Sequence, residues 1–338
     1  MQDWLTYNEA YKLEEESRLN TDFKRLCTYG IRALDDPLLA IAKNELVVIG
    51  ADSGIGKSSL ILDIARHNAK KGKKVALFYL EGGFLEAIQR MKWRDICELY
   101  YRERATHQYQ EIDFRKWVLN CGSNLSELSC RAYEQSKEKY KDNFSLYPIT
   151  EGFKIDDLLT SLLDFHKLTD TKFGEFKKEG IYDLDLIIID HLQYFSLDRD
   201  DNEITEITRI IREVKKITDH SNIPVIMVSH LRKKNKDRGL PDQEDFYGSS
   251  NIPKIASTAI TIAPDTHEDN LSTNIFPTFF RIVKSRIGIR PNYAMRCHYD
   301  LNRRAYEDDY KIFRLDAMGN IMPELSLEQM PAWYKRKT

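Results

Sequence analysis

A glycine-rich run in the first part of the chain has the residue types that bind the phosphates of a nucleotide. Its members are Gly50, Ala51, Asp52, Ser53, Gly54, Ile55, Gly56, Lys57, Ser58 and Ser59. The backbone N–H groups of such a loop, and the positive end of the helix after it, attract anions. In the pattern G-x-x-x-x-G-K-[ST], the lysine reaches the β- and γ-phosphates and the hydroxyl residue binds Mg²⁺. Lys57 and Ser58 hold these positions, whereas Ala51 replaces the first glycine. The run predicts a site for ATP and Mg²⁺, against the alternative of an ordinary glycine loop.

Three polar residues stand at the ends of apolar runs of strand length: Glu81, Asp190 and, after Ser229, His230. In a parallel α/β sheet, ligands bind beyond the carboxyl ends of the strands. Asp190 could therefore bind the Mg²⁺, Glu81 could orient the attacking water as a general base, and His230 could contact the γ-phosphate. Each has a plainer alternative: a structural carboxylate for Asp190, a helix-start carboxylate for Glu81 and a core histidine for His230.

The segment after His230 is basic and could contact a phosphate backbone. Its basic residues are Arg232, Lys233, Lys234, Lys236 and Arg238. A flexible basic loop at a strand end can bind DNA without reading its sequence. The alternative is a charged surface that contacts only solvent.

The composition is that of a folded chain without an overall basic field. The 338 residues are 42% hydrophobic and 31% charged, with a net charge of −2, so any nucleic-acid contact must be local. None of the five scattered cysteines stands at zinc-ligand spacing, which is typical of a reducing compartment. No apolar run approaches the roughly 18 residues of a membrane span, and the N-terminus has no signal- or transit-peptide pattern. We expect a cytoplasmic protein that does not contact a membrane.

The elements that position these residues alternate between strands and helices. Runs typical of β-strands occupy 46–49, 75–80, 144–147, 184–189, 224–228, 258–263, 279–284, 293–299 and 312–315. Helical spacing of apolar residues is clearest at 84–104, 155–163 and 204–217. The expected fold is therefore α/β: a largely parallel twisted sheet flanked by helices, with an antiparallel addition at the C-terminus.

We divide the chain into an N-terminal helical arm at 1–28, an ATPase domain at 29–320 and a C-terminal tail at 321–338. The arm has too few apolar residues for a core of its own, so it packs either on its own domain or on a neighbouring subunit. The tail is either a partner-binding peptide or a frayed end.

In chain order, five motifs resemble the RecA-like P-loop motor of replicative hexameric helicases. They are the glycine-rich run, Glu81, Asp190-His191-Leu192-Gln193, Ser229-His230-Leu231-Arg232 and Lys284-Ser285-Arg286. The chain is similar to the DnaB type, and closer still to the helicase half of phage primase–helicases and mitochondrial Twinkle, from about residue 29 to 316. Ala51 agrees with this resemblance, because DnaB-type loops commonly begin with Gly-Ala.

The resemblance implies a role for each motif. Lys57 and Ser58 would bind phosphate and Mg²⁺, Glu81 would be the catalytic base, and Asp190 would be the Mg²⁺ carboxylate. Gln193 would couple the nucleotide state to DNA, with His230 as its γ-phosphate sensor. Arg286, together with Lys284, would enter the neighbouring subunit's site as an arginine finger.

The resemblance also implies where DNA and the nucleotide base bind, and where this chain departs from the family. Residues 232–238 and the group Ser249, Ser250 and Asn251 stand where the family's DNA-binding loops lie. Tyr299 stands about where a base-stacking tyrosine would. An arginine that often follows the strand at 258–263 is replaced by Pro264-Asp265. No primase region precedes the motor, so we expect any primase to be a separate chain.

The function expected from these features is a 5′→3′ hexameric DNA helicase that hydrolyses ATP with Mg²⁺ at subunit interfaces while holding single-stranded DNA. The alternative is a RecA-fold ATPase that is no helicase but a nucleotide-switched assembly or loader protein in a phage, plasmid or defence system. A nucleotide-binding scaffold without activity is disfavoured by the intact Lys57, Glu81 and Asp190.

Overall fold

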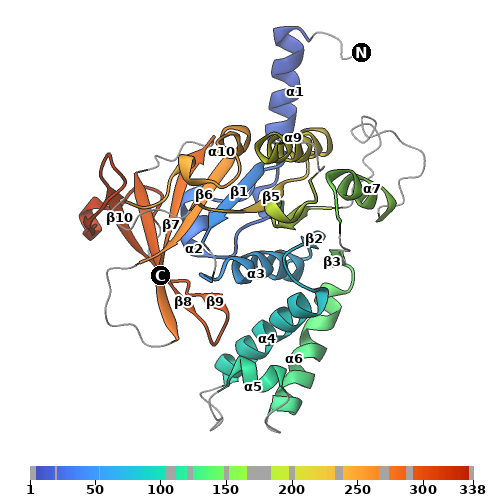
Figure 1. The fold of residues 1–338 in the computed structure, drawn as a ribbon, viewed down its shortest axis with the longest axis vertical. Helices are drawn as coiled ribbons and strands as arrows, with labels where there is room; N and C mark the ends of the chain where they lie inside the picture. The colour runs from blue at the N-terminus through green and yellow to red at the C-terminus, as the bar shows by residue number, and fades with distance from the viewer. Residues whose placement is uncertain are drawn as a thin grey trace.

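The strands of the protein form one mixed sheet. The computed structural model describes residues 5–19, 21–52, 54–103, 112–119, 125–147, 152–165, 184–197, 202–232, 239–265, 274–286 and 292–334. Within these ranges the strand order is β11-β10-β8-β7-β6-β1-β5-β4-β2-β3, and β9 pairs with β8. Figure 1 shows the sheet at the centre of the molecule, with helices on both sides of it.

One half of the sheet is parallel. Its strands are β1 (Leu46–Ala51), β2 (Val75–Tyr79), β3 (Phe144–Tyr147), β4 (Leu186–Asp190), β5 (Val225–His230) and β6 (Thr258–Pro264). Because these strands run in one direction, their carboxyl ends meet at one edge of the sheet. The other half is antiparallel, and its strands are β7 (Ile275–Ser285), β8 (Tyr293–Asp300), β9 (Ala305–Tyr306), β10 (Lys311–Leu315) and β11 (Ile321–Glu324). The expected α/β fold, with an antiparallel C-terminal addition, is confirmed.

Both faces of the parallel half are covered, which explains its almost continuous apolar runs. Alternate residues such as Val47, Leu77 and Ile188 face one core together with α2 (Arg32–Leu38) and α3 (Lys57–Lys70). The residues between them face a second core with α7 (Ile155–Phe165), α9 (Glu203–Ser221) and α10 (Asn251–Ile255). Short 3₁₀ helices occur at Phe23–Arg25, Leu192–Tyr194, Gln243–Asp245 and Leu327–Gln329.

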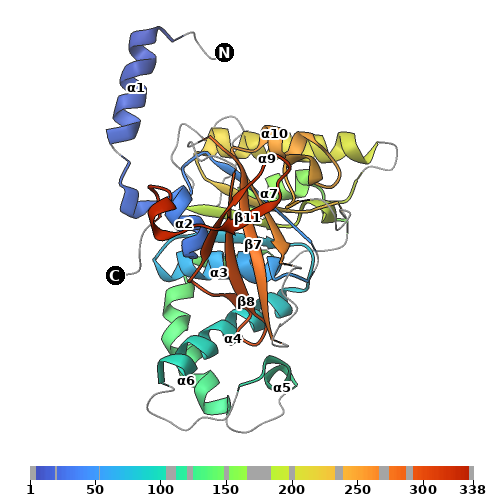
Figure 2. The ribbon, with the colours of Figure 1, turned by 90° about the vertical axis from the view of Figure 1, so that its left-hand side faces the viewer.

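A helical subdomain is inserted between β2 and β3. It consists of α4 (Phe84–Glu103), α5 (Phe114–Val118) and α6 (Leu125–Tyr140), and it extends away from the sheet in both views (Figures 1 and 2). Its core is built on Trp93, whose ring centroid lies 5.6 Å from those of Phe114 and Trp117. The subdomain therefore has a small core of its own beside the two cores of the sheet.

The two ends of the chain differ in how they pack. Helix α1 (Tyr7–Leu19) has no buried residue and extends away from the body (Figure 2). The residues assigned from the sequence to a tail begin instead with β11, and the ring of Trp333 packs on Tyr293 with 6.0 Å between centroids. No helix in the described ranges is long and apolar enough to cross a bilayer.

Candidate nucleotide site

The glycine-rich loop joins β1 to α3 and has a backbone that only glycine adopts without strain. Gly56 has a φ of +88°, and a Cβ there would lie 2.6 Å from the ring of Tyr299. Ser53, the fourth residue of the predicted loop, lies outside the described residues. The loop thus leads directly into the N-terminus of α3, the arrangement that binds phosphate in P-loop proteins.

Lys57 is the first residue of α3 and lies between the ends of other strands. Its side chain is only 5% exposed, and its Nζ lies 3.6 Å from Glu81 Oε2 and 3.3 Å from His230 Nδ1. Burial lowers the pKa of Lys57, and the carboxylates of Glu81 and Asp190 oppose that shift. The structure therefore brings together four residues that the sequence placed in one site.

Asp190, at the end of β4, is completely buried. Neither of its carboxylate oxygens has a hydrogen-bond partner among the described residues. Burial raises the pKa of Asp190 to about 7, Glu81 acts in the same direction, and Lys57 and the nearby Ser58 hydroxyl oppose them. A buried carboxylate without partners is stabilised by a nearby cation, so Asp190 and Ser58 fit a bound Mg²⁺.

Glu81 follows β2, which pairs with β4, so it lies beside Asp190. The backbone N–H groups of Leu80 and Glu81 both donate to the carbonyl of Asp190, the second at 3.2 Å. The Glu81 side chain remains 33% exposed. It therefore faces accessible space next to Lys57, as a base for a water molecule requires.

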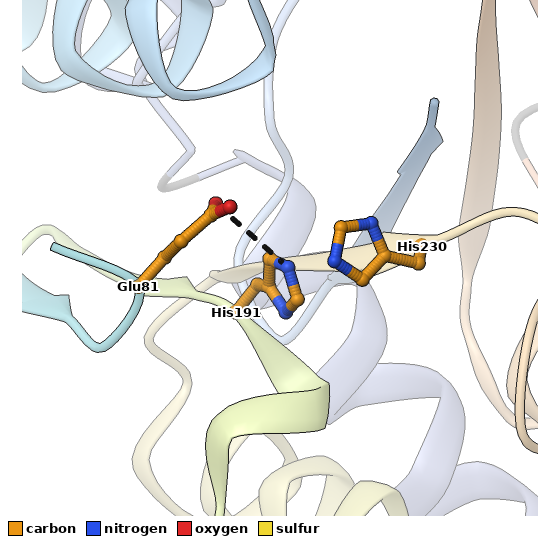
Figure 3. A group of neighbouring side chains, drawn as sticks. All are labelled: Glu81, His191 and His230. Carbon is orange, nitrogen blue, oxygen red and sulfur yellow. Dashed lines mark ion pairs between the residues drawn. The ribbon is translucent and has the colours of Figure 1, made fainter. Parts of the chain in front are cut away.

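Glu81, His191 and His230 form a compact group (Figure 3). His191 Nε2 lies 3.8 Å from Glu81 Oε2, and the rings of His191 and His230 are 4.0 Å apart. His191 is buried, and neither of its ring nitrogens has a hydrogen-bond partner in the described part of the chain. Two histidines and a glutamate form a common zinc ligand set. However, the Lys57 ammonium contacts Glu81 and His230 at the distances above, so a positive charge already lies beside these ligand atoms. We therefore assign no metal to this group.

Gln193 connects the site to a distant loop. Its side-chain oxygen accepts from the backbone N–H of His230 at 3.1 Å. Its amide nitrogen donates to Ser229 Oγ at 2.9 Å and to the carbonyl of Tyr247 at 3.3 Å. The side chain expected to couple nucleotide to DNA thus bridges the end of β5 and the segment before Ser249.

A pocket of about 390 Å³ opens over the loop. It is lined by Gly54, Gly56, Lys57, Ser58, Ser59, Tyr79, Glu81, Gly82, Glu86, Arg90, Tyr194, Tyr299, Leu301 and Arg304. Sequence reasoning missed Arg90 and Arg304. The sequence did contain one indication of where Arg90 lies. It stands four residues after Glu86 in a predicted helix, and the two form an ion pair on α4. Arg304 carried no such signal, because the turn between β8 and β9 brings it to the pocket.

Tyr299, on β8, lies beneath the glycine-rich loop. It is 2% exposed, and its hydroxyl lies 2.8 Å from Ser59 Oγ. The neighbouring Tyr306 donates to the carbonyl of Ile55. Tyr299 and Tyr306 therefore connect the antiparallel half of the sheet to the loop and to the start of α3.

Lys284 and Arg286 lie at the end of β7 and do not line the pocket of their own protomer. Arg286 is exposed. Lys284 Nζ donates to the carbonyls of Pro253, Lys254 and Ala256, each at 2.7 Å. Lys284 and Arg286, which the resemblance assigns together to an arginine finger, thus differ: Lys284 is bonded to backbone carbonyls and Arg286 is exposed.

The candidate DNA-binding residues are placed only in part. Lys233, Lys234, Lys236 and Arg238 lie outside the described residues, and Arg232 is exposed. Ser249 is 1% exposed, and its hydroxyl lies 3.0 Å from that of Thr208 on α9. Ser250 is exposed and Asn251 is partly exposed, so these two are open to a ligand.

Comparisons with known proteins identify relatives of this chain. A family described as "DnaB-like helicase C terminal domain" matches residues 27–140 and 149–306. Replicative DNA helicase DnaC of Bacillus subtilis (strain 168) is 26% identical over 267 residues, which are 77% of this chain and 52% of DnaC. The DNA helicase/primase of Enterobacteria phage T3 is 24% identical over 265 residues, 75% of this chain and 41% of the phage protein. The chain thus spans about half the length of the curated relatives it matches.

The solved structures agree on the fold. A DnaB-like replicative helicase, solved in a study of its interactions with primase, superimposes with a TM-score of 0.66 and 18% identity, covering 90% of this chain and 67% of the helicase. A separately solved ATPase domain superimposes with a TM-score of 0.69. The family match extends over well more than half of the residues, and it includes the loop, Glu81, Asp190, Gln193, His230 and Arg286. The chain therefore belongs to the DnaB-like helicase C-terminal domain family and has its RecA-like ATPase fold.

Proposed function

We propose that this chain is the ATP-hydrolysing motor of a DNA helicase that moves on single-stranded DNA. The observation that carries the proposal is the convergence of Lys57, Glu81, Asp190 and His230 at one sheet edge, with Gln193 connecting them to an accessible loop. A site that only bound nucleotide would need neither the accessible carboxylate of Glu81 nor this connection.

The residues of the site divide the work of hydrolysis. Lys57 and the loop N–H groups hold the β- and γ-phosphates of ATP, and Glu81 orients a water molecule and accepts its proton as it attacks the γ-phosphate. Ser58 and Asp190 would hold the Mg²⁺, which neutralises negative charge on the phosphates. Loss of the γ-phosphate changes the contact of His230. Gln193, bonded to the His230 backbone, transmits that change toward Ser250 and Asn251.

The site is completed by a second copy of the chain. Arg286 is exposed and absent from its own pocket, so it is the candidate to stabilise the transition state in the neighbouring protomer. The arrangement is proposed to be a hexameric ring with 5′→3′ movement, on the basis of the family resemblance. A primase, if one cooperates with this motor, would act as a partner.

The N-terminal arm is proposed to contact a neighbouring protomer. Helix α1 buries none of its own side chains, and Tyr7, Tyr11 and Leu13 are 80%, 51% and 54% exposed. Deletion of residues 1–22 should reduce the mass of the assembly in analytical ultracentrifugation without unfolding the ATPase domain. An unchanged mass would show that the arm does not hold the assembly together.

A forked-duplex assay tests the function as a whole. Strand separation is followed with a labelled forked DNA, and ATP turnover is measured in parallel with and without single-stranded DNA. Lys57→Ala, purified in the same way, controls for contaminating enzymes. The proposal expects strand separation and DNA-stimulated turnover from the unmodified chain only. Stimulation without strand separation would favour the alternative of a nucleotide-switched assembly protein.

A further inference from the structure

Arg304, in the turn between β8 and β9, is held differently from the other cations that line the nucleotide pocket. Lys57 and Arg90 each form an ion pair with a carboxylate of the same pocket. The guanidinium carbon of Arg304 lies instead 4.6 Å from the centroid of the Phe114 ring, on α5 of the helical subdomain. Its Nε is buried and has no hydrogen-bond partner among the described residues. Arg304 therefore brings to the pocket a guanidinium that is fixed by stacking on an aromatic ring.

The backbone of Arg304 adopts a conformation that glycine favours. Its φ is +54°, in the left-handed region, where a side chain such as arginine is under strain. Contacts with the helical subdomain fix the turn in this form. Trp93 Nε1 donates to the carbonyl of Asn302 at 2.6 Å, and the Arg94 guanidinium donates to the carbonyl of Arg303 at 3.2 Å. A strained backbone that surrounding contacts maintain is typical of functional positions.

Arg304 lies at the end of the pocket away from the proposed catalytic base. Helix α4 begins beside Glu81, since a Cβ added to Gly82 would lie 2.8 Å from Glu86 Oε2. An α-helix rises about 1.5 Å per residue, so Trp93, which is bonded to the turn, lies about 10 Å further along α4 than Glu86. Because Glu81 is proposed to act at the γ-phosphate, the part of ATP nearest the turn is the nucleoside.

We propose that Arg304 stacks on the nucleobase of ATP and so sets the affinity for the nucleoside part of the ligand. A guanidinium is planar and binds aromatic groups on its faces, and Phe114 covers one of them. Leu301, from the same turn, adds an apolar side chain to the pocket. Tyr299, for which the resemblance implies this contact, is 2% exposed beneath Gly56 and has little surface for a base. This assignment rests on the proposed ATP site of the motor, but not on its helicase activity.

Two ligands separate a base contact from a phosphate contact: ATP, and inorganic tripolyphosphate, which has no base. Calorimetry on the protein with Mg²⁺ and without DNA gives both affinities, and their ratio is the readout. Arg304→Met keeps the apolar stem and removes the planar group, so the ratio of ATP to tripolyphosphate affinity should fall about tenfold. Arg303→Met is the matched control. Its guanidinium carbon lies 4.4 Å from the centroid of the Tyr101 ring, and the residue is absent from the pocket lining, so the ratio should not change.

Arg304→Lys separates stacking from attraction between charges. Lysine keeps the positive charge but has no planar face, so the ratio should fall as it does in Arg304→Met. An unchanged ratio in Arg304→Met, with the fold checked by circular dichroism, would overturn the proposal, as would full ATP affinity in Arg304→Lys. A lowered ratio in a chain that never separates DNA strands would support the base contact and reject the helicase function. A failure of the unmodified chain to bind ATP would overturn both.

Discussion

Asp190 and His191 in the parallel half of the sheet differ from Tyr299 and Lys284 in the antiparallel half in how their polar atoms are bonded. In the parallel half, the strand ends bring together groups whose bonding capacity is unused: neither carboxylate oxygen of Asp190 and neither ring nitrogen of His191 has a hydrogen-bond partner among the described residues. In the antiparallel half, Tyr299 is bonded to Ser59 and Lys284 to three carbonyls. Buried polar groups without partners destabilise a fold, whereas partnered ones stabilise it. The comparison indicates that Asp190 and His191 are available to a ligand, whereas Tyr299 and Lys284 connect segments of the protein.

The largest effect is expected at Lys57, the centre of the parallel edge. Lys57→Ala removes the cation that contacts Glu81 and His230 and that is expected to hold the phosphates, so ATP turnover should be abolished. Phosphate release measures the turnover, and the circular dichroism spectrum checks that the variant is folded. Normal turnover in a folded variant would reject the nucleotide site.

Substitution of Arg286 tests whether a residue of the antiparallel half takes part in ATP hydrolysis. Arg286→Ala should lose turnover on the order of a thousandfold while it still binds ATP, because the arginine is expected to act only in the transition state of the neighbouring site. Mixing this variant with Lys57→Ala should restore part of the activity, since an intact loop then meets an intact arginine in some interfaces. If no mixture regains turnover, Arg286 is structural rather than catalytic.

The raised pKa of Asp190 makes the free energy of unfolding depend on pH. The folded protein holds the Asp190 proton up to about pH 7, because its pKa is raised from 3.8 to about 7, whereas an unfolded chain releases the proton near 3.8. Folding is therefore penalised progressively as the pH rises between these values, and the penalty stays constant above pH 7. Asp190→Asn lacks this penalty, so without nucleotide and Mg²⁺ it should be more stable than the unmodified protein at about pH 8, by on the order of a few kcal/mol. The advantage should be small near the unfolded pKa, and urea-unfolding midpoints at the two pH values measure it. A variant less stable at the higher pH would show that Asp190 is paired after all.

Tyr299→Phe is expected to have the smallest effect and the opposite sign. It removes the hydroxyl bonded to Ser59 and keeps the ring beneath Gly56, so the free energy of unfolding should fall by about 1 kcal/mol. Tyr11→Phe, on the exposed helix α1, is the matched control and should change nothing. Unaltered stability in Tyr299→Phe together with weaker ATP binding would assign Tyr299 to the nucleotide rather than to the support of the loop.

The sequence determined the parallel half and its edge. Strands buried on both faces are continuous apolar runs, so the strands before Glu81, Asp190 and His230 could be located, and a parallel sheet places such residues at one edge. Strand β11 could not be found in the same way, because Ile321–Glu324 is a short edge strand that contains a proline and buries little.

Which polar groups already have partners could not be predicted from the sequence. Ser249 and Lys284 have the same residue types as surface binding groups, but one is bonded to Thr208 on α9 and the other to the end of α10. Arg90 and Arg304 reach the pocket from a helix and from a turn that lie far apart in the chain. The spacing of residues along a chain specifies local periodicity. Whether a side chain has a partner depends on which distant segment packs against it, and only the folded structure contains that information.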